Sequence, residues 1–125
     1  MAAPNIAGLT TITGVSTFIS GVSTTSYNVL ISNAASSNQV FKLNTLVASN
    51  TTSNNTTAIT VKIFGGAAGT GSSVSMASSI AIPGGSSIVL IGKDNPVYIE
   101  ENRSIGVNAN FTNSVDVYAS YEAIS

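Results

Sequence analysis

The acidic side chains are the first candidates for chemistry in this sequence. They are Asp94, Glu100, Glu101, Asp116 and Glu122. The first three lie close together in the sequence, and hard cations such as Ca²⁺ bind carboxylate and carbonyl oxygens. Their spacing matches no Ca²⁺-binding loop, however, and Asp94 precedes a proline in a turn-forming stretch. We therefore interpret these carboxylates as hydrated turn residues and predict no metal site.

The other residue types give no further support for catalysis. The chain has no Cys and no His, so it lacks a thiol nucleophile, the common metal ligands and the commonest general base. A glycosidase needs two carboxylates facing each other across a sugar cleft, and no spacing here indicates such a pair. The glycine-rich segment 65–71 lacks the lysine and the following helix of a phosphate-binding loop. We predict no catalytic residue, no cofactor and no small-molecule substrate, and hence no enzyme.

The composition also restricts the partners. Four Lys or Arg and five Asp or Glu carry all the side-chain charge of 125 residues, which is 7% where a soluble domain has about 25%. Four scattered cations cannot neutralise a run of phosphates, which argues against nucleic-acid binding. The longest aliphatic run, 88–91, is far shorter than the roughly 20 residues of a membrane helix. The first residues do not resemble a signal peptide, so we expect neither secretion nor membrane insertion.

Alternation of apolar and polar residues predicts the elements that position these side chains. The alternation has period two, as in half-buried β-strands, and no segment has a convincing helical pattern. The expected strands include 27–31, 41–47, 59–63, 74–82, 88–91, 97–99, 105–111 and 115–121. Eight to nine short strands separated by turn signals predict an all-β fold, an antiparallel β-sandwich or jelly roll with no significant helix.

The same pattern suggests how the strands pair and which side chains are buried. The expected hairpins are 41–47 with 59–63 and 105–111 with 115–121. Each pair is separated by a polar, turn-forming segment, which is typical of a β-hairpin. The phase of alternation predicts that Val47 faces the same way as Leu43 and that Phe111 is in the core. The run 88–91 is apolar on both faces, as for a strand covered on both sides.

The first 26 residues have the loosest pattern. Apolar side chains recur there at irregular spacing among Thr, Ser and Gly, which are poor helix formers. We interpret residues 1–26 as an N-terminal arm or irregular strand. Residues 27–125 are expected to form a single β-sandwich domain.

Four bulky side chains are candidate contact residues. Tyr118 falls on the polar-facing register of the last strand, opposite in direction to Tyr121, and Tyr is enriched at interfaces. We predict an interface that includes Tyr118 and Tyr98, together with Phe18 and Ile19 from the N-terminal region. The alternative for each tyrosine is a place at the edge of the core with a hydrogen-bonded hydroxyl.

The expected surface is rich in small uncharged polar residues. The chain has 20 Ser, 14 Thr and 13 Asn, but three Lys and three Pro to protect all of its strand edges. An uncharged exterior costs less free energy to desolvate than a charged one, and the cores of interfaces are depleted in charge. We therefore predict that the protein assembles with copies of itself or a neighbour, the alternative being a monomer with a hydroxyl-rich surface.

Several stretches carry a resemblance to a known group of proteins. They are residues 1–6, 12–14, 31–37, 40–42, 93–101 and 118–125. These stretches resemble short virion structural proteins of tailed bacteriophages, especially marine and cyanobacterial ones. The resemblance implies a small β-sandwich within the virus particle and brings no catalytic residues with it.

One functional expectation and two alternatives follow. We expect a non-enzymatic virion structural protein, a capsid decoration or cement protein that stabilises the assembled head. It would assemble in the host cytoplasm as a homo-oligomer, a trimer, and contact the major capsid protein or other virion proteins, with the N-terminal arm reaching a neighbour. The first alternative is a neck, tail, baseplate or fibre-attachment protein of the same virion. The second is a receptor- or carbohydrate-binding module, which needs an exposed aromatic cleft.

Overall fold

The computed structural model describes residue 8 and residues 11–125, and within them it is all-β, which confirms the predicted fold class. Expectations for residues 1–7, 9 and 10 lie outside the described residues. The strands are β1 Ile12–Ile19, β2 Asn28–Asn33, β3 Val40–Asn50, β4 Thr57–Phe64, β5 Ser73–Ile82, β6 Ser87–Ile91, β7 Val97–Ile99, β8 Arg103–Ala109 and β9 Val115–Ile124. A short 3-10 helix, η2, spans Ala67–Gly69. No helix of the described residues is long and apolar enough to cross a membrane.

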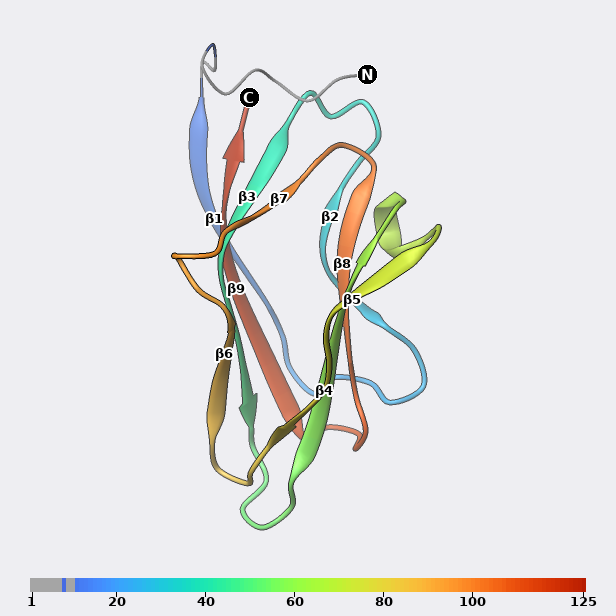
Figure 1. Cartoon of the computed structure of the whole chain (residues 1–125), viewed down its shortest axis with the longest axis vertical. Helices are drawn as coiled ribbons and strands as arrows, with labels where there is room; N and C mark the ends of the chain where they lie inside the picture. The colour runs from blue at the N-terminus through green and yellow to red at the C-terminus, as the bar shows by residue number, and fades with distance from the viewer. Residues whose placement is uncertain (1–7, 9–10) are drawn as a thin grey trace.

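The strands form two antiparallel sheets that pack face to face as a β-sandwich (Figure 1). Sheet A has the order β1–β9–β3–β6, with β7 also paired to β3, and sheet B has the order β2–β8–β4–β5. β4 and β5 are neighbours in both the sequence and a sheet. Most other consecutive strands lie in opposite sheets, so the chain repeatedly crosses the sandwich.

Both hairpins expected from the sequence are wrong for this reason. β3 belongs to sheet A and β4 to sheet B, while β8 belongs to sheet B and β9 to sheet A. The polar segments between them pass from one sheet to the other instead of folding a strand back on its neighbour. Alternation predicts that a strand buries one face. It does not predict whether the next strand in the sequence pairs with that strand or packs against it from the opposite sheet, because the same face is buried in both cases.

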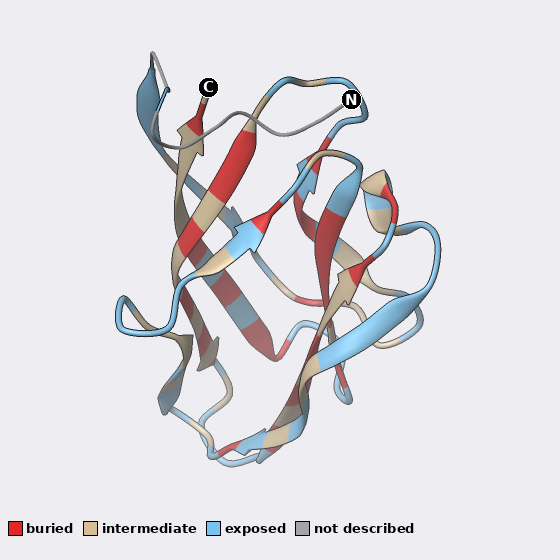
Figure 2. Cartoon of the chain, turned by 45° about the horizontal axis from the view of Figure 1, so that its top comes forward, coloured by how far each residue is buried: buried red, intermediate tan, exposed pale blue. Residues whose placement is uncertain are grey.

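The core fills the space between the sheets (Figure 2). Buried residues alternate with partly buried ones along most of β3 and β4, and with exposed ones in the first half of β9. In β3 the register with β9 shifts between Leu43 and Thr45, which marks a β-bulge. One extra residue inverts the phase of the strand beyond it. Leu46 and Ala48 are therefore buried, and Val47 faces outward, which corrects the expectation that Val47 shares a face with Leu43.

Two other apolar positions expected inside are exposed. Val89 lies on β6, an edge strand of sheet A, and its side chain faces solvent rather than a covering layer. Phe111 is exposed because β8 ends at Ala109, which places Phe111 in the turn that follows. An apolar run cannot by itself distinguish a strand covered on both faces from an edge strand with an uncovered face.

Part of the region interpreted as an arm or irregular strand is a regular edge strand. β1 pairs with β9 residue by residue, from Ile12 opposite Ile124 to Ile19 opposite Val117, without a register shift. The loop that follows β1 is held to β9 by a hydrogen bond from the backbone N–H of Gly21 to Oδ1 of Asp116, at 2.9 Å. β1 therefore completes sheet A rather than extending away from it.

Candidate interaction surface

A row of apolar side chains crosses the outer face of sheet A from one edge to the other. Phe18 of β1 lies opposite Tyr118 of β9, Tyr118 opposite Val47 of β3, and Val47 opposite Val89 of β6. Residues directly opposite each other on neighbouring strands share a face and lie about 5 Å apart. Phe18 is 75% exposed, Val89 63% and Tyr118 47%. We refer to Phe18, Tyr118, Val47 and Val89 as the apolar row.

The bulge in β3 completes this row. β1 and β9 pair without interruption, so their alternation alone places Phe18 and Tyr118 together on the outer face. β3 has its bulge between Leu43 and Thr45. Without that extra residue Val47 would point into the core, and the row would be interrupted at its centre.

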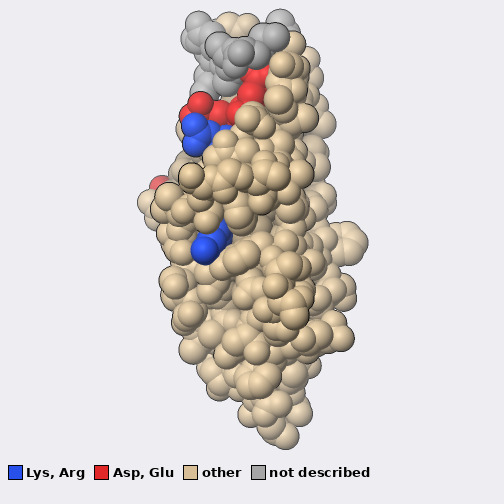
Figure 3. Space-filling view, turned by 90° about the vertical axis from the view of Figure 1, so that its right-hand side faces the viewer, with Lys and Arg blue, Asp and Glu red and all other residues tan. Residues whose placement is uncertain are grey.

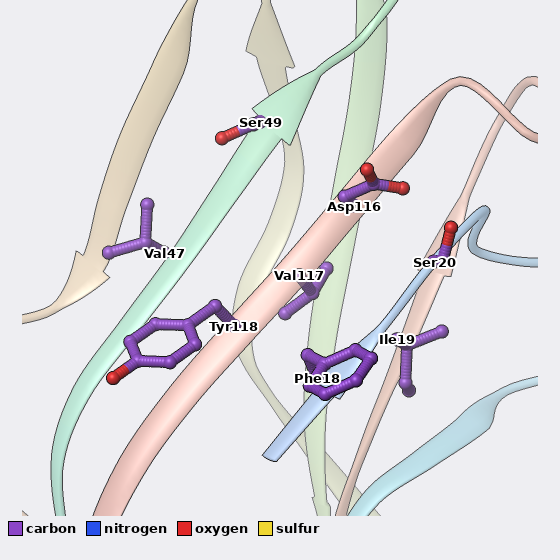
Figure 4. Close-up of a pocket in the computed structure, with 8 residues that line it drawn as sticks. All are labelled: Phe18, Ile19, Ser20, Val47, Ser49, Asp116, Val117 and Tyr118. Atoms are coloured by element: carbon purple, nitrogen blue, oxygen red, sulfur yellow. The ribbon is translucent and has the colours of Figure 1, made fainter. Parts of the chain in front are cut away.

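A hollow of about 330 Å³ opens beside the row. Its lining residues are Phe18, Ile19, Ser20, Val47, Ser49, Asp116, Val117 and Tyr118. Figure 4 shows Ser20, Ser49 and Asp116 toward one end and Phe18, Tyr118 and Val47 toward the other. A mostly apolar depression with a few convergent polar groups is typical of a binding or contact site.

The structure brings two of the four predicted interface residues together, namely Phe18 and Tyr118. Tyr98 is exposed on β7 and pairs with Lys42, which puts it on the same face farther along β3. Ile19 points to the inner side of β1 and packs against the core while also bordering the hollow.

Sequence reasoning missed Val47 and Val89 as surface residues. The adjacent polar residues Asn44 and Thr45, followed by Leu46, interrupt the alternation and are a signal for the bulge before Val47. Sequence reasoning missed this signal because Thr45 and Val47 also continue the phase of Leu43. The run that contains Val89 carries no such signal, since its exposure depends on β6 being an edge strand. Only the pairing of strands shows that these valines continue the aromatic pair.

Part of the outer face of sheet B, over β2 and β8, is covered by the chain itself. The glycine-rich segment folds back over β2 and β8, where the N–H of Gly69 donates to Ser104 Oγ at 2.8 Å. Ser104 Oγ in turn donates to the carbonyl of Gly66 at 2.7 Å. Beside this loop, the rings of Tyr27 and Phe64 pack edge to face with centroids 5.8 Å apart. Viewed from this side, the surface is mostly uncharged (Figure 3). Charged side chains gather toward one end, and a separate basic patch lies near the middle.

The acidic residues do not form a catalytic or metal-binding cluster in the described part of the chain. No group of three or more Asp or Glu residues there is arranged to hold a metal ion. Glu101 Oε2 accepts a hydrogen bond from the backbone N–H of Asn38 at 3.0 Å, and Asp116 holds the loop after β1. These two carboxylates therefore fix loops.

A scan against protein-family models and a search of the curated proteins each found no match to this chain.

Proposed function

We propose that the protein is a non-enzymatic structural subunit of a bacteriophage virion, a capsid decoration or cement protein. The apolar row is the observation that carries the proposal. Covering exposed apolar area is favourable by about 25 cal/mol per Å². On one side of the row the outer-face positions Ser16, Ser120 and Thr45 carry no charge that would oppose desolvation. On the other side Asp116 is charged, and its Oδ1 accepts a hydrogen bond from the backbone N–H of Gly21. This face gains free energy when another protein covers it.

The strand order supports the same proposal. β6 and β7 both pair with β3, so they can be counted as one interrupted edge strand. Successive strands then alternate between the sheets except at the β4–β5 hairpin, which is the winding of a jelly roll. Jelly rolls occur in viral capsid and lectin domains. A fold alone does not determine function. The strand order therefore supports the proposal only together with the apolar row and the resemblance to virion proteins.

The proposed partners are copies of this chain and the major capsid protein or other virion proteins. A cement protein bridges neighbouring shell subunits, and its binding free energy then opposes expansion of the filled head. The expected trimer stays a prediction about copy number. The alternative location, in the neck, tail, baseplate or a fibre attachment, uses the same surface in a ring rather than over the shell.

Replacing the aromatic pair tests this proposal. The double variant Phe18→Ser with Tyr118→Ser removes the two aromatic side chains of the row, and Val74→Ser removes an exposed valine from β5 as a control. Cryo-electron microscopy of intact particles measures the occupancy of each protein. We expect wild type and Val74→Ser to occupy positions over the icosahedral shell and the double variant to be lost from them. Full occupancy by the double variant would contradict the proposal, and density restricted to a neck or tail ring would favour the alternative location.

The hollow favours a second candidate function, a receptor- or carbohydrate-binding module. Aromatic faces pack against the C–H groups of sugars, and the carboxylate of Asp116 and the hydroxyls of Ser20 and Ser49 supply polar groups at one end. A glycan array probed with wild type and with Tyr118→Ala tests this candidate. Binding to one glycan class that Tyr118→Ala abolishes would support it, and no binding by wild type would eliminate it for the glycans on the array.

A further inference from the structure

The free edges of the two sheets differ in how they are protected against pairing with another strand. Soluble proteins protect such edges with bulges, charges, prolines, short strands or covering loops. β5 has register shifts in its pairing with β4, and its Ser79 adopts a positive φ of 50°. The β6–β7 edge is interrupted by a turn that contains Lys93, Asp94 and Pro96.

β2 is also protected, whereas β1 is not. β2 has six residues, a register shift between Val29 and Ile31, and the η2 loop bound to it through the N–H of Ala68 and Ser32 Oγ at 2.9 Å. β1 has eight residues, and its sequence ITGVSTFI contains no charge and no proline. Its register with β9 is unbroken. β1 is thus a regular and uncharged edge of the described structure.

The backbone of β1 presents unpaired groups at this edge. Thr11 and Ser125 exchange two backbone hydrogen bonds, of 3.0 and 2.9 Å. Bonded and non-bonded pairs alternate along an antiparallel ladder, so the odd-numbered residues of β1 bond to β9. The N–H and C=O groups of the even-numbered residues, Ile12, Gly14, Ser16 and Phe18, therefore point away from β9. No described residue pairs with them.

We propose that β1 pairs antiparallel with β1 of a second copy about a two-fold axis at Val15. This pairing deepens the proposed function, on which it rests, by naming one self-contact of the subunit. A two-fold contact closes at two copies, so within the expected assembly of trimers it would join subunits of two neighbouring trimers. It sets Ile12 opposite Phe18 of the second copy and Gly14 opposite Ser16 of the second copy. All four outward-pointing residues then exchange hydrogen bonds, about eight across the interface at two per pair.

The side chains of β1 match this register. Ile12 is 54% exposed and Phe18 is the most exposed of the large apolar residues, so each end of the pair sets an aliphatic side chain against an aromatic one. Gly14 and Ser16 meet at the centre, where their small size lets the strands approach. β1 has no charge that would repel its copy. The two A sheets become one continuous sheet, and the apolar row of one copy continues toward the other.

The symmetry of this pairing gives it a specific covalent test. Val15 lies opposite its own copy as a non-bonded pair, with Cα atoms about 4.5 Å apart, which is within the range of a disulfide. The chain has no native Cys, so a single introduced thiol reports one contact. Val15→Cys is expected to form mostly disulfide-linked dimer on mild oxidation, read on a non-reducing gel. Val74→Cys, exposed on the bulged β5 edge, is the matched control and is expected to stay mostly monomeric.

Thr13→Cys and Thr17→Cys test the register. They lie opposite each other across the proposed axis, so a mixture of the two variants is expected to cross-link while each variant alone does not. Ser16→Pro tests the backbone bonds, because it removes an outward N–H without removing a bond to β9. We expect Ser16→Pro to unfold cooperatively in urea, which shows that it is folded. In sedimentation velocity its self-association is expected to be weaker than that of wild type by a factor of about ten or more.

Two outcomes overturn the pairing. One is Val15→Cys cross-linking no better than Val74→Cys although the unmodified protein self-associates, which assigns self-association to another surface. The other is a protein that is monomeric in solution at all concentrations tested. In both cases cryo-electron microscopy of particles reports separately on the proposed function, because a protein that still occupies the shell retains its structural role without the β1 contact.

Discussion

The outer faces of the two sheets both carry aromatic side chains, but the chain covers these side chains on sheet B alone. Phe64 and Tyr27 pack together over β8, beside the loop that Ser104 holds in place. Phe18 and Tyr118 also lie side by side, yet no described segment covers them. Phe64 is 8% exposed and Phe18 is 75% exposed, so one phenylalanine contributes to folding and the other is available for contact.

This contrast separates stability from assembly. An apolar side chain stabilises the monomer by the area that folding removes from water. On sheet B much of that area is removed within one chain, because Phe64 is buried, although Val29 stays 39% exposed. On sheet A the same gain is left for a second protein, which is the physical basis of the proposed structural role.

Removing each phenylalanine should give the largest difference between the faces. We expect Phe64→Ala to lower the free energy of unfolding by about 3–4 kcal/mol, as for other buried Phe truncations. Phe18→Ala should change it by less than about 0.5 kcal/mol, because little area is lost from the folded monomer. Urea denaturation at low protein concentration measures both. Equal losses would show that sheet A is covered within the monomer and would remove the contrast.

Adding a methyl group at the glycines of the two faces should give the next largest difference. A Cβ at Gly106 would lie 2.9 Å from Cε2 of Phe64 and 3.3 Å from Cβ of Tyr27. We expect Gly106→Ala to lower the free energy of unfolding by about 2 kcal/mol through overpacking. At Gly14 a Cβ meets nothing within 4 Å, so Gly14→Ala is expected to leave stability unchanged or raise it slightly. Thermal unfolding checks the pair, and a stable Gly106→Ala would mean that the Tyr27–Phe64 layer is loose.

Removing one hydroxyl on each face is a finer test. Ser104 is fully buried and bonds both Gly69 and Gly66, so we expect Ser104→Ala to cost about 1.5 kcal/mol by leaving these groups unpaired. Ser120→Ala on sheet A is the control and should be neutral. Hydrogen exchange of the Gly69 amide provides a local readout. Unchanged protection of that amide in Ser104→Ala would contradict the role of Ser104 in holding the loop.

The smallest expected effect concerns Tyr121, the tyrosine on the inner face of β9. Burial raises the pKa of Tyr121 above its ordinary value. The folded state therefore holds this proton more tightly, so its stabilising contribution is complete below about pH 10 and is lost as the pH rises through the raised pKa. Tyr121→Phe should reduce the loss of stability between about pH 9 and about pH 12. Urea denaturation across this range measures how the free energy of unfolding changes with pH, and an unchanged slope in Tyr121→Phe would refute the assignment.

Several features of the fold follow from local residue patterns. Alternation predicts strands because it shows that one face of a segment is apolar. Strands of a β-sandwich bury one such face whatever the order of the strands in the sheets. It located most of the strands. It also predicted that Tyr118 and Tyr121 point in opposite directions, and the ring of Tyr121 indeed packs on Phe41 in the core, with ring centroids 4.8 Å apart. The low charge likewise predicts a surface that is inexpensive to desolvate.

Strand partners and the site depend on the tertiary structure. Whether β9 folds back on β8 or crosses to β1 and β3 is decided by long-range packing, which the polar turn before β9 does not encode. The position of Val47 depends on a one-residue bulge, and the exposure of Val89 depends on β6 being an edge strand. Composition and alternation thus specify an all-β chain with few charges. Which apolar side chains meet follows from long-range packing, because cross-strand neighbours are set by register between strands that are distant in the sequence.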